Sequence, residues 1–386
     1  MPQGRSQFVK PRLPSLDGLR AVSIALVLLQ HASLTPSFPF ALAPLGDAGF
    51  GVHIFFVISG FIITLLLLDE ERENDGISLK RFYLRRMVRI LPVFWTFLLI
   101  MLLARRIYVG EFFQAATFTA GMGLWSTPGT WNTAHGWSLA VEEQFYLLWP
   151  AAMVLLGRTS WRVALLIAVV ALANFTRCWA MTHSAVYWSM SHPGHWWSPF
   201  ERAWQLMGVR TFLSHVDLLA CGCLLAIAMQ RRPSLVQTIA NWRPAIGRPL
   251  AVIVMYFAPV SLKNIASRFD LPVDALLNTI RGTAIAYLIA SYILVQRGWS
   301  YRGLNSRSIV AIGLMSYSLY VWQQPFLGAH ITWPWEVNLL ITFVVAAASY
   351  QLVEKPLRRL VRHRAALKPR ATHVFAATVS PATLGA

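Results

Sequence analysis

Long apolar runs alternate with short polar connectors along the whole chain. Ten of these runs approach the length of about 20 residues that a helix needs to cross a bilayer. They cover residues 18–35, 48–68, 91–109, 137–156, 161–181, 211–229, 249–262, 273–296, 309–329 and 335–353, and the run at 249–262 is the weakest. The pattern predicts an all-α polytopic membrane protein with about ten transmembrane helices in one bundle.

The runs follow one another without a repeat and without an appended polar domain. We therefore expect a single membrane domain over residues 14–360, preceded by a short cytoplasmic segment at 1–13. The polar residues 361–386 are rich in Ala, Thr and Pro and are expected to form a disordered cytoplasmic tail.

Composition supports the membrane assignment. Of the 386 residues, 56% are hydrophobic and 13% are charged, whereas about a quarter are charged in soluble domains. An ordinary cytosolic globule is therefore excluded. Disorder of the whole chain is excluded as well, because 22 Phe, 16 Trp and 11 Tyr supply too much apolar surface.

The charge of the chain is strongly positive but follows the connectors. A net charge of +18 in a soluble protein would suggest nucleic acid as a partner. Here most Lys and Arg residues fall in the two tails and in the even-numbered connectors, as cytoplasmic loops require. We expect both termini on the cytoplasmic side of the inner membrane and no nucleic-acid partner. The three cysteines are interpreted as packing residues.

The first candidate pair lies on the first apolar run. Arg20 and His31 are eleven residues apart, which places them on nearly one helical face, about 16 Å apart along the axis. Charged groups within a membrane helix are costly and mark candidate functional sites. Asp17 lies three residues before Arg20, so a local ion pair is an alternative reason for this arginine. His31 is a candidate general base, with helix packing as its alternative role.

The second candidate group opens the run at 137–156. Glu142 lies seven residues after His135 and shares its face if the helix extends that far, whereas Glu143 points elsewhere. A carboxylate that orients a histidine is a recurrent catalytic arrangement. The alternative is structural, with Ser138 as the N-cap and both glutamates near the positive end of the helix dipole.

Basic residues gather before the third run. Arg85, Arg86 and Arg89 would lie on one side of a helical segment, an arrangement that suits phosphate groups. Topology signals and anionic lipids require the same residues, so a lipid-facing role stays open.

The second run carries small residues and a histidine. Helix packing is the expected role of its glycines and of Ser59. His53 is a candidate for a site lining. The outer stretch at 182–210 contains several histidines and tryptophans that could stack on a sugar or form an interfacial aromatic belt. No metal site is expected, because the histidines lack a ligand spacing.

Several blocks in order resemble the acyltransferase 3 family of bacterial membrane O-acyltransferases, over about residues 14–360. The blocks contain Arg20 with His31, the Gly-rich segment 49–62, the pair Arg86 and Arg89, the segment 135–146, and the segments 315–325 and 349–356. The family often has aspartate where His53 stands and histidine where Gln323 stands, so neither position is given a role.

The resemblance implies transfer of an acyl group, commonly acetyl, from a cytosolic acyl-coenzyme A to a hydroxyl. The acceptor would be a surface saccharide, a lipid-linked saccharide or a secondary metabolite. Under this hypothesis His31 is the general base, Arg20 is a further catalytic candidate, and Glu142 or His135 assists. Arg86 and Arg89, with Arg85, hold the donor phosphates. Contacts to the substrate are expected from four residues of the fourth run, namely Trp137, Ser138, Glu143 and Tyr146.

Direct attack on the thioester and an acyl-histidine intermediate both remain open at the level of sequence. Two other classes of protein compete with the enzyme hypothesis. A transporter could use the intramembrane Arg20 and His31 for substrate or proton coupling. A noncatalytic membrane scaffold would explain the aromatic belts and the basic loops.

Overall fold

The computed structural model describes residues 13–119, 129–182, 212–266 and 274–366. Within these ranges the chain is helical and contains no strand. Each of the ten apolar runs coincides with a helix. These helices are α1 (Leu16–Ala32), α2 (Ala48–Asn74), α3 (Leu79–Leu103), α5 (Gly136–Leu155), α6 (Thr159–Thr182), α9 (Phe212–Arg231), α11 (Pro244–Ala266), α12 (Asp274–Leu294), α14 (Arg307–Trp322) and α15 (Trp335–Ser349).

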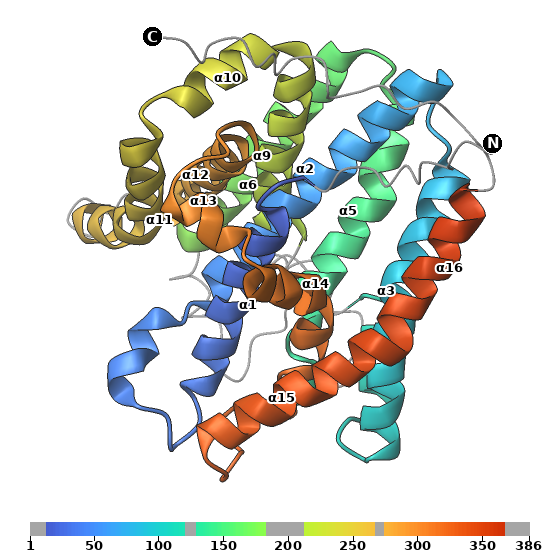
Figure 1. Cartoon of the computed structure of the whole chain (residues 1–386), viewed down its shortest axis with the longest axis vertical. Coiled ribbons are helices and arrows are strands. Elements are labelled where there is room, and N and C mark those ends of the chain that lie inside the picture. Colours follow the sequence, from blue (N-terminus) through green and yellow to red (C-terminus); the bar gives the residue numbers. More distant parts are fainter. Residues whose placement is uncertain (1–12, 120–128, 183–211, 267–273, 367–386) are drawn as a thin grey trace, which may run out of the picture.

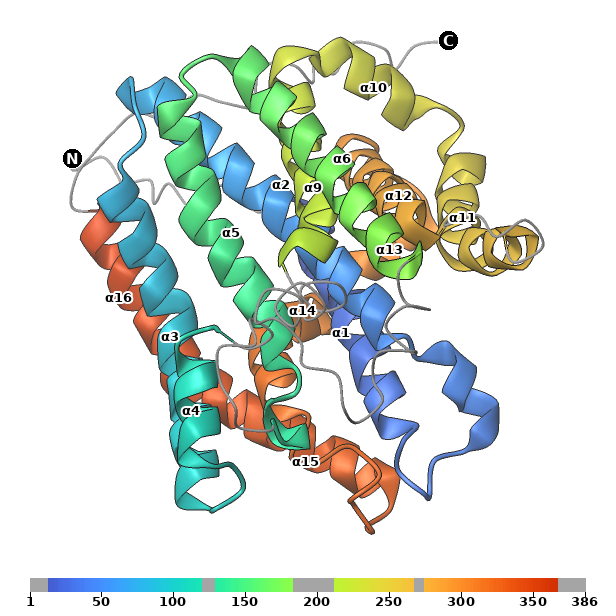
Figure 2. The ribbon, with the colours of Figure 1, turned by 180° about the vertical axis from the view of Figure 1, so that it is seen from behind.

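Shorter helices fill the connectors. They are η1 (Phe40–Leu45), α4 (Val109–Ala116), η2 (Trp131–Thr133), α10 (Pro233–Asn241), α13 (Trp299–Leu304) and α16 (Lys355–Ala366), with a π-helical turn at Tyr350–Glu354 before α16. Helix α16 lies beside α3 in both views of the molecule (Figures 1 and 2). Helix α16 extends to Ala366 and therefore includes the first residues, 361–366, of the predicted tail. Residues 367–386 lie outside the described part.

Six helical segments are long and apolar enough to cross a membrane, among the residues that the structure describes. They are Phe40–Asn74, Leu79–Leu103, Thr159–Cys178, Phe212–Arg231, Leu276–Leu294 and Trp335–Leu360. Helices α1 and α14 have only 17 and 16 residues, and α5 carries two adjacent glutamates. The protein is therefore an all-helical, multi-pass membrane protein, for which six spans rather than ten follow from length and hydropathy.

Helix ends follow local capping chemistry. Asp47 accepts a hydrogen bond from the backbone N–H of Phe50 at 2.8 Å and thereby begins α2. Ser78 does the same for Arg81 at the start of α3. Because α3 begins at Leu79, the basic run that hydropathy placed in a connector is helical and continuous with the apolar part of α3.

The centre of the bundle is built on small residues. Helices α2 and α9 meet at Gly60 and Gly222, where a Cβ atom would stand 2.0 Å from the carbonyl oxygen of Leu219 and 2.1 Å from that of Val57, respectively. Such close backbone approach is typical of membrane helix pairs. The glycine of the second run therefore has the packing role that its sequence indicated. Helix α14 packs against α1 (Figure 1). Residues of these two helices and of α2, α3 and α5 line the candidate site.

Candidate active site

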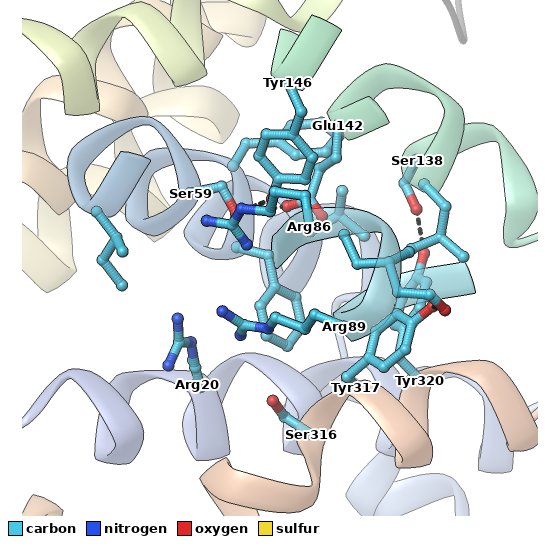
Figure 3. A pocket seen from close by; sticks show the side chains of 16 residues that line it. Arg20, Ser59, Arg86, Arg89, Ser138, Glu142, Tyr146, Ser316, Tyr317 and Tyr320 are labelled. Atoms are coloured by element: carbon cyan, nitrogen blue, oxygen red, sulfur yellow. Dashed lines mark hydrogen bonds between the residues drawn. The ribbon is translucent and has the colours of Figure 1, made fainter. Parts of the chain in front are cut away.

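A polar cavity lies between α1, α2, α3, α5 and α14 (Figure 3). The empty space between its lining residues amounts to about 740 Å³ when the open mouth is included. Its polar lining comprises Arg20, Ser59, Arg86, Arg89, Ser138, Glu142, Tyr146, Ser316, Tyr317 and Tyr320. Apolar side chains from the same helices complete the wall. The cavity thus combines several cations with a single carboxylate.

A second cavity continues the first toward the start of α1, and we call it the vestibule. Its lining shares Arg20, Ile62 and Arg89 with the first cavity, so the two spaces lie next to each other. Arg85 and Arg358 line only the vestibule, and Asp17 is the acidic group of its lining. Arg86 lines only the deeper cavity. The lining residues therefore present guanidinium groups in sequence from the vestibule inward.

The arginines differ in how far their charge is compensated. Arg20 bonds Asp17 at 3.2 Å, as the spacing of the two residues indicated. Arg85 bonds Glu70 at 2.9 Å. Arg86 stacks 4.6 Å from the ring centroid of Tyr146, and neither Arg86 nor Arg89 forms an ion pair within the described ranges. Of the three arginines predicted for donor binding, Arg86 and Arg89 are therefore freer than Arg85 to bind an anion.

Glu142 lies deep in the cavity, in a small network. The hydroxyl of Ser59 donates to Glu142 at 2.7 Å and accepts from the hydroxyl of Tyr146 at 3.1 Å. Ser59, which the sequence suggested as a packing residue, thus belongs to the cavity wall. The carboxylate faces the guanidinium of Arg86 across this wall (Figure 3).

The opposite end of the cavity is closed by Ser138 and Tyr320. Their hydroxyl oxygens lie 2.5 Å apart, and both residues are buried. The ring of Tyr320 packs edge-on against the imidazole of His135, with centroids 5.5 Å apart. His135 and His31 line neither cavity, and Ser138 and Tyr320 are the cavity residues that contact His135.

Two consecutive glutamines at the end of α14 hold the two histidines. His31 Nδ1 lies 2.5 Å from Oε1 of Gln323, and His135 Nδ1 lies 2.6 Å from Oε1 of Gln324. Both glutamines are buried, at 0% and 2% exposure. His31 on α1 and His135 at the start of α5 are thereby held by neighbouring residues at the end of α14. We call these two histidines the histidine pair.

The geometry assigns the tautomer of His135. Oε1 of Gln324 also accepts the backbone N–H of His135 at 3.0 Å, so this atom is the amide oxygen rather than the nitrogen. The ring Nδ1 must therefore donate to it, which leaves Nε2 as a lone-pair acceptor. Nε2 of His135 is buried and has no hydrogen-bond partner among the described residues. Gln323 as placed presents Oε1 to Nδ1 of His31, and in the tautomer that donates to this oxygen Nε2 of His31 is left to accept a proton.

Sequence reasoning missed the segment that carries the third ring of this cluster. The indole of Trp131 donates to the carbonyl oxygens of Gln324 and Leu327 and meets the ring of His31 edge-on at 5.3 Å. The segment is held by Glu111, which is 1% exposed and accepts hydrogen bonds from Thr130 and Thr133. A lone glutamate in a polar connector gives no sequence signal of this contact.

Other predicted residues lie apart from this arrangement. Trp137 packs on Phe56 and on His215, which places it toward α9, and it lines neither cavity. Glu143 is also absent from both linings. His53 is buried beside His215 rather than in a cavity wall. Glu142 contacts Ser59, whereas Gln324 is the side chain that holds His135.

The aromatic and histidine-rich stretch at 182–210 lies outside the described residues. Within the described part of the chain, no group of three or more His, Cys, Asp or Glu side chains is placed to hold a metal ion.

Comparison with known proteins places the chain in a family. The profile of an acyltransferase domain family, acyltransferase 3, matches residues 13–351, which include the cavity and the histidine pair. The peptidoglycan O-acetyltransferase OatA of Listeria monocytogenes is 27% identical over 92% of this chain and 57% of its own length.

Two further relatives match this chain with similar identity and coverage. The putative peptidoglycan O-acetyltransferase YrhL of Bacillus subtilis is 24% identical over 90% of this chain and 55% of its own length. The O-acetyltransferase OatA of Staphylococcus aureus is 24% identical over 97% of this chain and 62% of its own length. The chain thus spans between about half and two thirds of these relatives. No solved structure matches it significantly. The match over nearly the whole membrane domain shows that the chain belongs to the acyltransferase 3 family.

Proposed function

We propose that this protein is a membrane O-acetyltransferase that moves an acetyl group from acyl-coenzyme A to a hydroxyl of a saccharide. Family membership supports acyl transfer and disfavours the transporter alternative. The names of the three relatives support O-acetylation, and two of them name peptidoglycan, a saccharide polymer. The observation that carries the proposal is a cavity lined by arginines whose closed end abuts His135, which consecutive glutamines hold together with His31.

The proposed topology places donor and acceptor on opposite sides. With ten spans and both termini in the cytoplasm of the inner membrane, the vestibule opens inward and the histidine pair lies in the outer half. The vestibule arginines then meet a cytosolic donor. The acceptor saccharide approaches from the other face.

Donor binding follows from the free guanidinium groups. Coenzyme A carries several phosphates, and arginine forks bind phosphate oxygens in pairs. Arg86 and Arg89, which have no ion pair among the described residues, bind these phosphates in our proposal, with Arg20 at the junction of the two cavities. The acyl end then extends toward Ser138 and Tyr320.

In the proposed reaction, Nε2 of His31 accepts the proton of the acceptor hydroxyl. The oxygen attacks the thioester carbonyl carbon, the new C–O bond forms, and the C–S bond breaks. The departing thiolate takes the proton back from the imidazolium. His135, held by Gln324, stabilises the reacting groups, and the hydroxyls of Ser138 and Tyr320 are donors for the developing oxyanion once their mutual hydrogen bond opens.

The test is transfer of label from acetyl-coenzyme A to peptidoglycan fragments by purified protein in lipid nanodiscs. His31→Ala should reduce transfer by at least about 100-fold, because base catalysis contributes about 10²–10⁴. His330→Ala is the control, since this exposed histidine lies near the cluster without a hydrogen bond to either glutamine. Near-normal transfer by His31→Ala would contradict the assignment of the base.

The donor site is tested in the same assay. Replacing Arg86 and Arg89 together by Gln should raise KM for acetyl-coenzyme A about 100-fold, because two charge-assisted contacts are lost. Arg81→Gln on the same helix is the matched control, since Arg81 is exposed and lines neither cavity. Unchanged KM in the double variant would refute this donor site.

A further inference from the structure

Helix α16 places one more guanidinium at the vestibule, from a part of the chain that lies beyond the family match. Arg358 lines the vestibule together with Arg20, Arg85 and Arg89. The family profile ends at residue 351, so nothing in that match assigns a role to α16. The π-helical turn at Tyr350–Glu354 connects α15 to α16, and α16 packs against α3, the helix of the other donor arginines.

Arg358 is fixed in place by a buried carboxylate. It forms an ion pair with Glu354, one turn earlier, and Glu354 is 1% exposed. The other oxygen of Glu354 accepts the hydroxyl of Ser318 on α14 at 2.6 Å. Nε of Arg358 is buried without a hydrogen-bond partner among the described residues. The side chain is thus oriented by α14 and retains donor capacity for a ligand.

The order of the lining residues separates two anion positions. Arg86 lies only in the deep cavity, Arg20 and Arg89 lie at the junction, and Arg358 lies only in the vestibule. A donor whose thioester end points toward Ser138 leaves its nucleotide end in the vestibule. Coenzyme A has two anionic groups along this direction, a pyrophosphate nearer the thioester and a phosphate on the ribose.

We propose that Arg358 forms a second anion subsite, which binds the ribose phosphate of coenzyme A while Arg86 and Arg89 bind the pyrophosphate. This inference rests on the proposed function, because it requires an acyl-coenzyme A donor. It adds α16 to the donor site. It also gives the Ser318–Glu354 contact a role in positioning a ligand-binding arginine.

The experiment measures Kd of the purified full chain for coenzyme A and for dephospho-coenzyme A, which lacks the ribose phosphate. Arg358→Gln should weaken binding of coenzyme A about tenfold and leave binding of dephospho-coenzyme A unchanged. Arg359→Gln is the matched control, with the same charge change on the same helix at an exposed position outside both cavities. It should bind both compounds like the parent.

The outcomes separate this inference from the proposed function. If the parent protein binds coenzyme A but Arg358→Gln and Arg359→Gln have the same Kd for it, the subsite is refuted. The proposal that acyl-coenzyme A is the donor is then unaffected. Equal weakening toward both compounds also refutes the ribose-phosphate assignment. If the parent binds neither compound, the acyl-coenzyme A donor and this subsite both fail. If Arg358→Gln does not fold, Arg358→Lys is measured in its place. Lysine lacks the planar fork of arginine, so the Kd for coenzyme A should rise about threefold. A Kd equal to that of the parent would refute the subsite.

Discussion

At the scale of single residues, the two glutamines of α14 decide which nitrogen of each histidine can react. An imidazole is a base at one nitrogen only when the other is protonated, and a fixed acceptor selects that form. Gln323 and Gln324 supply such acceptors for His31 and His135. The glutamines are therefore positioning residues, and the histidines are the groups proposed to meet substrate.

Gln323→Leu removes the acceptor of His31 and should lower kcat about 10- to 100-fold, because half of the neutral imidazole population and its fixed orientation are lost. The KM for acetyl-coenzyme A should stay unchanged, since Gln323 lies outside both cavities. Steady-state kinetics of the labelled transfer separates the two parameters.

Gln323→Glu serves as the rescue variant, because it keeps an oxygen at the position of Oε1. It should recover at least part of kcat. If the leucine and glutamate variants were equally impaired, Gln323 would act through packing rather than through its oxygen.

Sequence reasoning found the histidines but not their partners. Arg20, His31 and His135 are unusual in apolar surroundings, so each stands out in the sequence itself. Gln323 lies 292 residues from His31, and no local spacing connects two positions on different helices. The expected alignment of Glu142 with His135 used an ideal helix, whereas α5 begins only at Gly136 and the two side chains enter different networks.

At the scale of elements, the apolar runs predicted the helices well, but amphipathic and short elements were missed. Hydropathy placed the third helix at residues 91–109, whereas α3 begins at Leu79 because Ser78 caps it and its arginines face a cavity. Helix α4 is only 8 residues long and gives no span-like signal. Its Glu111 nevertheless holds the segment that carries Trp131.

Glu111→Gln should loosen this segment, because one oxygen of Glu111 accepts all three hydrogen bonds from Thr130 and Thr133 and becomes a neutral acceptor in the amide. A hydrogen bond to a charged group is worth about 1.5–3 kcal/mol, more than one to a neutral acceptor. Amide hydrogen exchange should therefore rise at residues 130–134, and kcat should fall about tenfold as Trp131 loses its position beside His31.

Glu336→Gln is the control for that change, because Glu336 is exposed in the first turn of α15. It should leave both exchange and kcat at parent values. Parent-like exchange at residues 130–134 in Glu111→Gln would show that packing alone holds the segment.

At the scale of the whole molecule, the uneven distribution of basic residues and the position of the vestibule point to the same orientation. Basic residues lie at the end of α2 and along the first turns of α3, and Arg85 and Arg89 of α3 line the vestibule. Loops that retain positive charge stay in the cytoplasm, which is also where acyl-coenzyme A is available. The count of spans could not be settled from hydropathy, because α1, α5 and α14 contain the polar groups of the site or are short.

The orientation itself is testable with two single-cysteine variants made after Cys178, Cys221 and Cys223 are replaced by alanine. Ala41→Cys lies between α1 and α2, on the proposed outer side, and Ser234→Cys lies in α10 on the proposed cytoplasmic side; both positions are exposed. A membrane-impermeant maleimide should label Ala41→Cys in intact spheroplasts and Ser234→Cys only after permeabilisation. Labelling in the reverse order would place the arginine vestibule outside the cell, where a cytosolic donor could not reach it, and would thereby refute the proposed route of acetyl transfer.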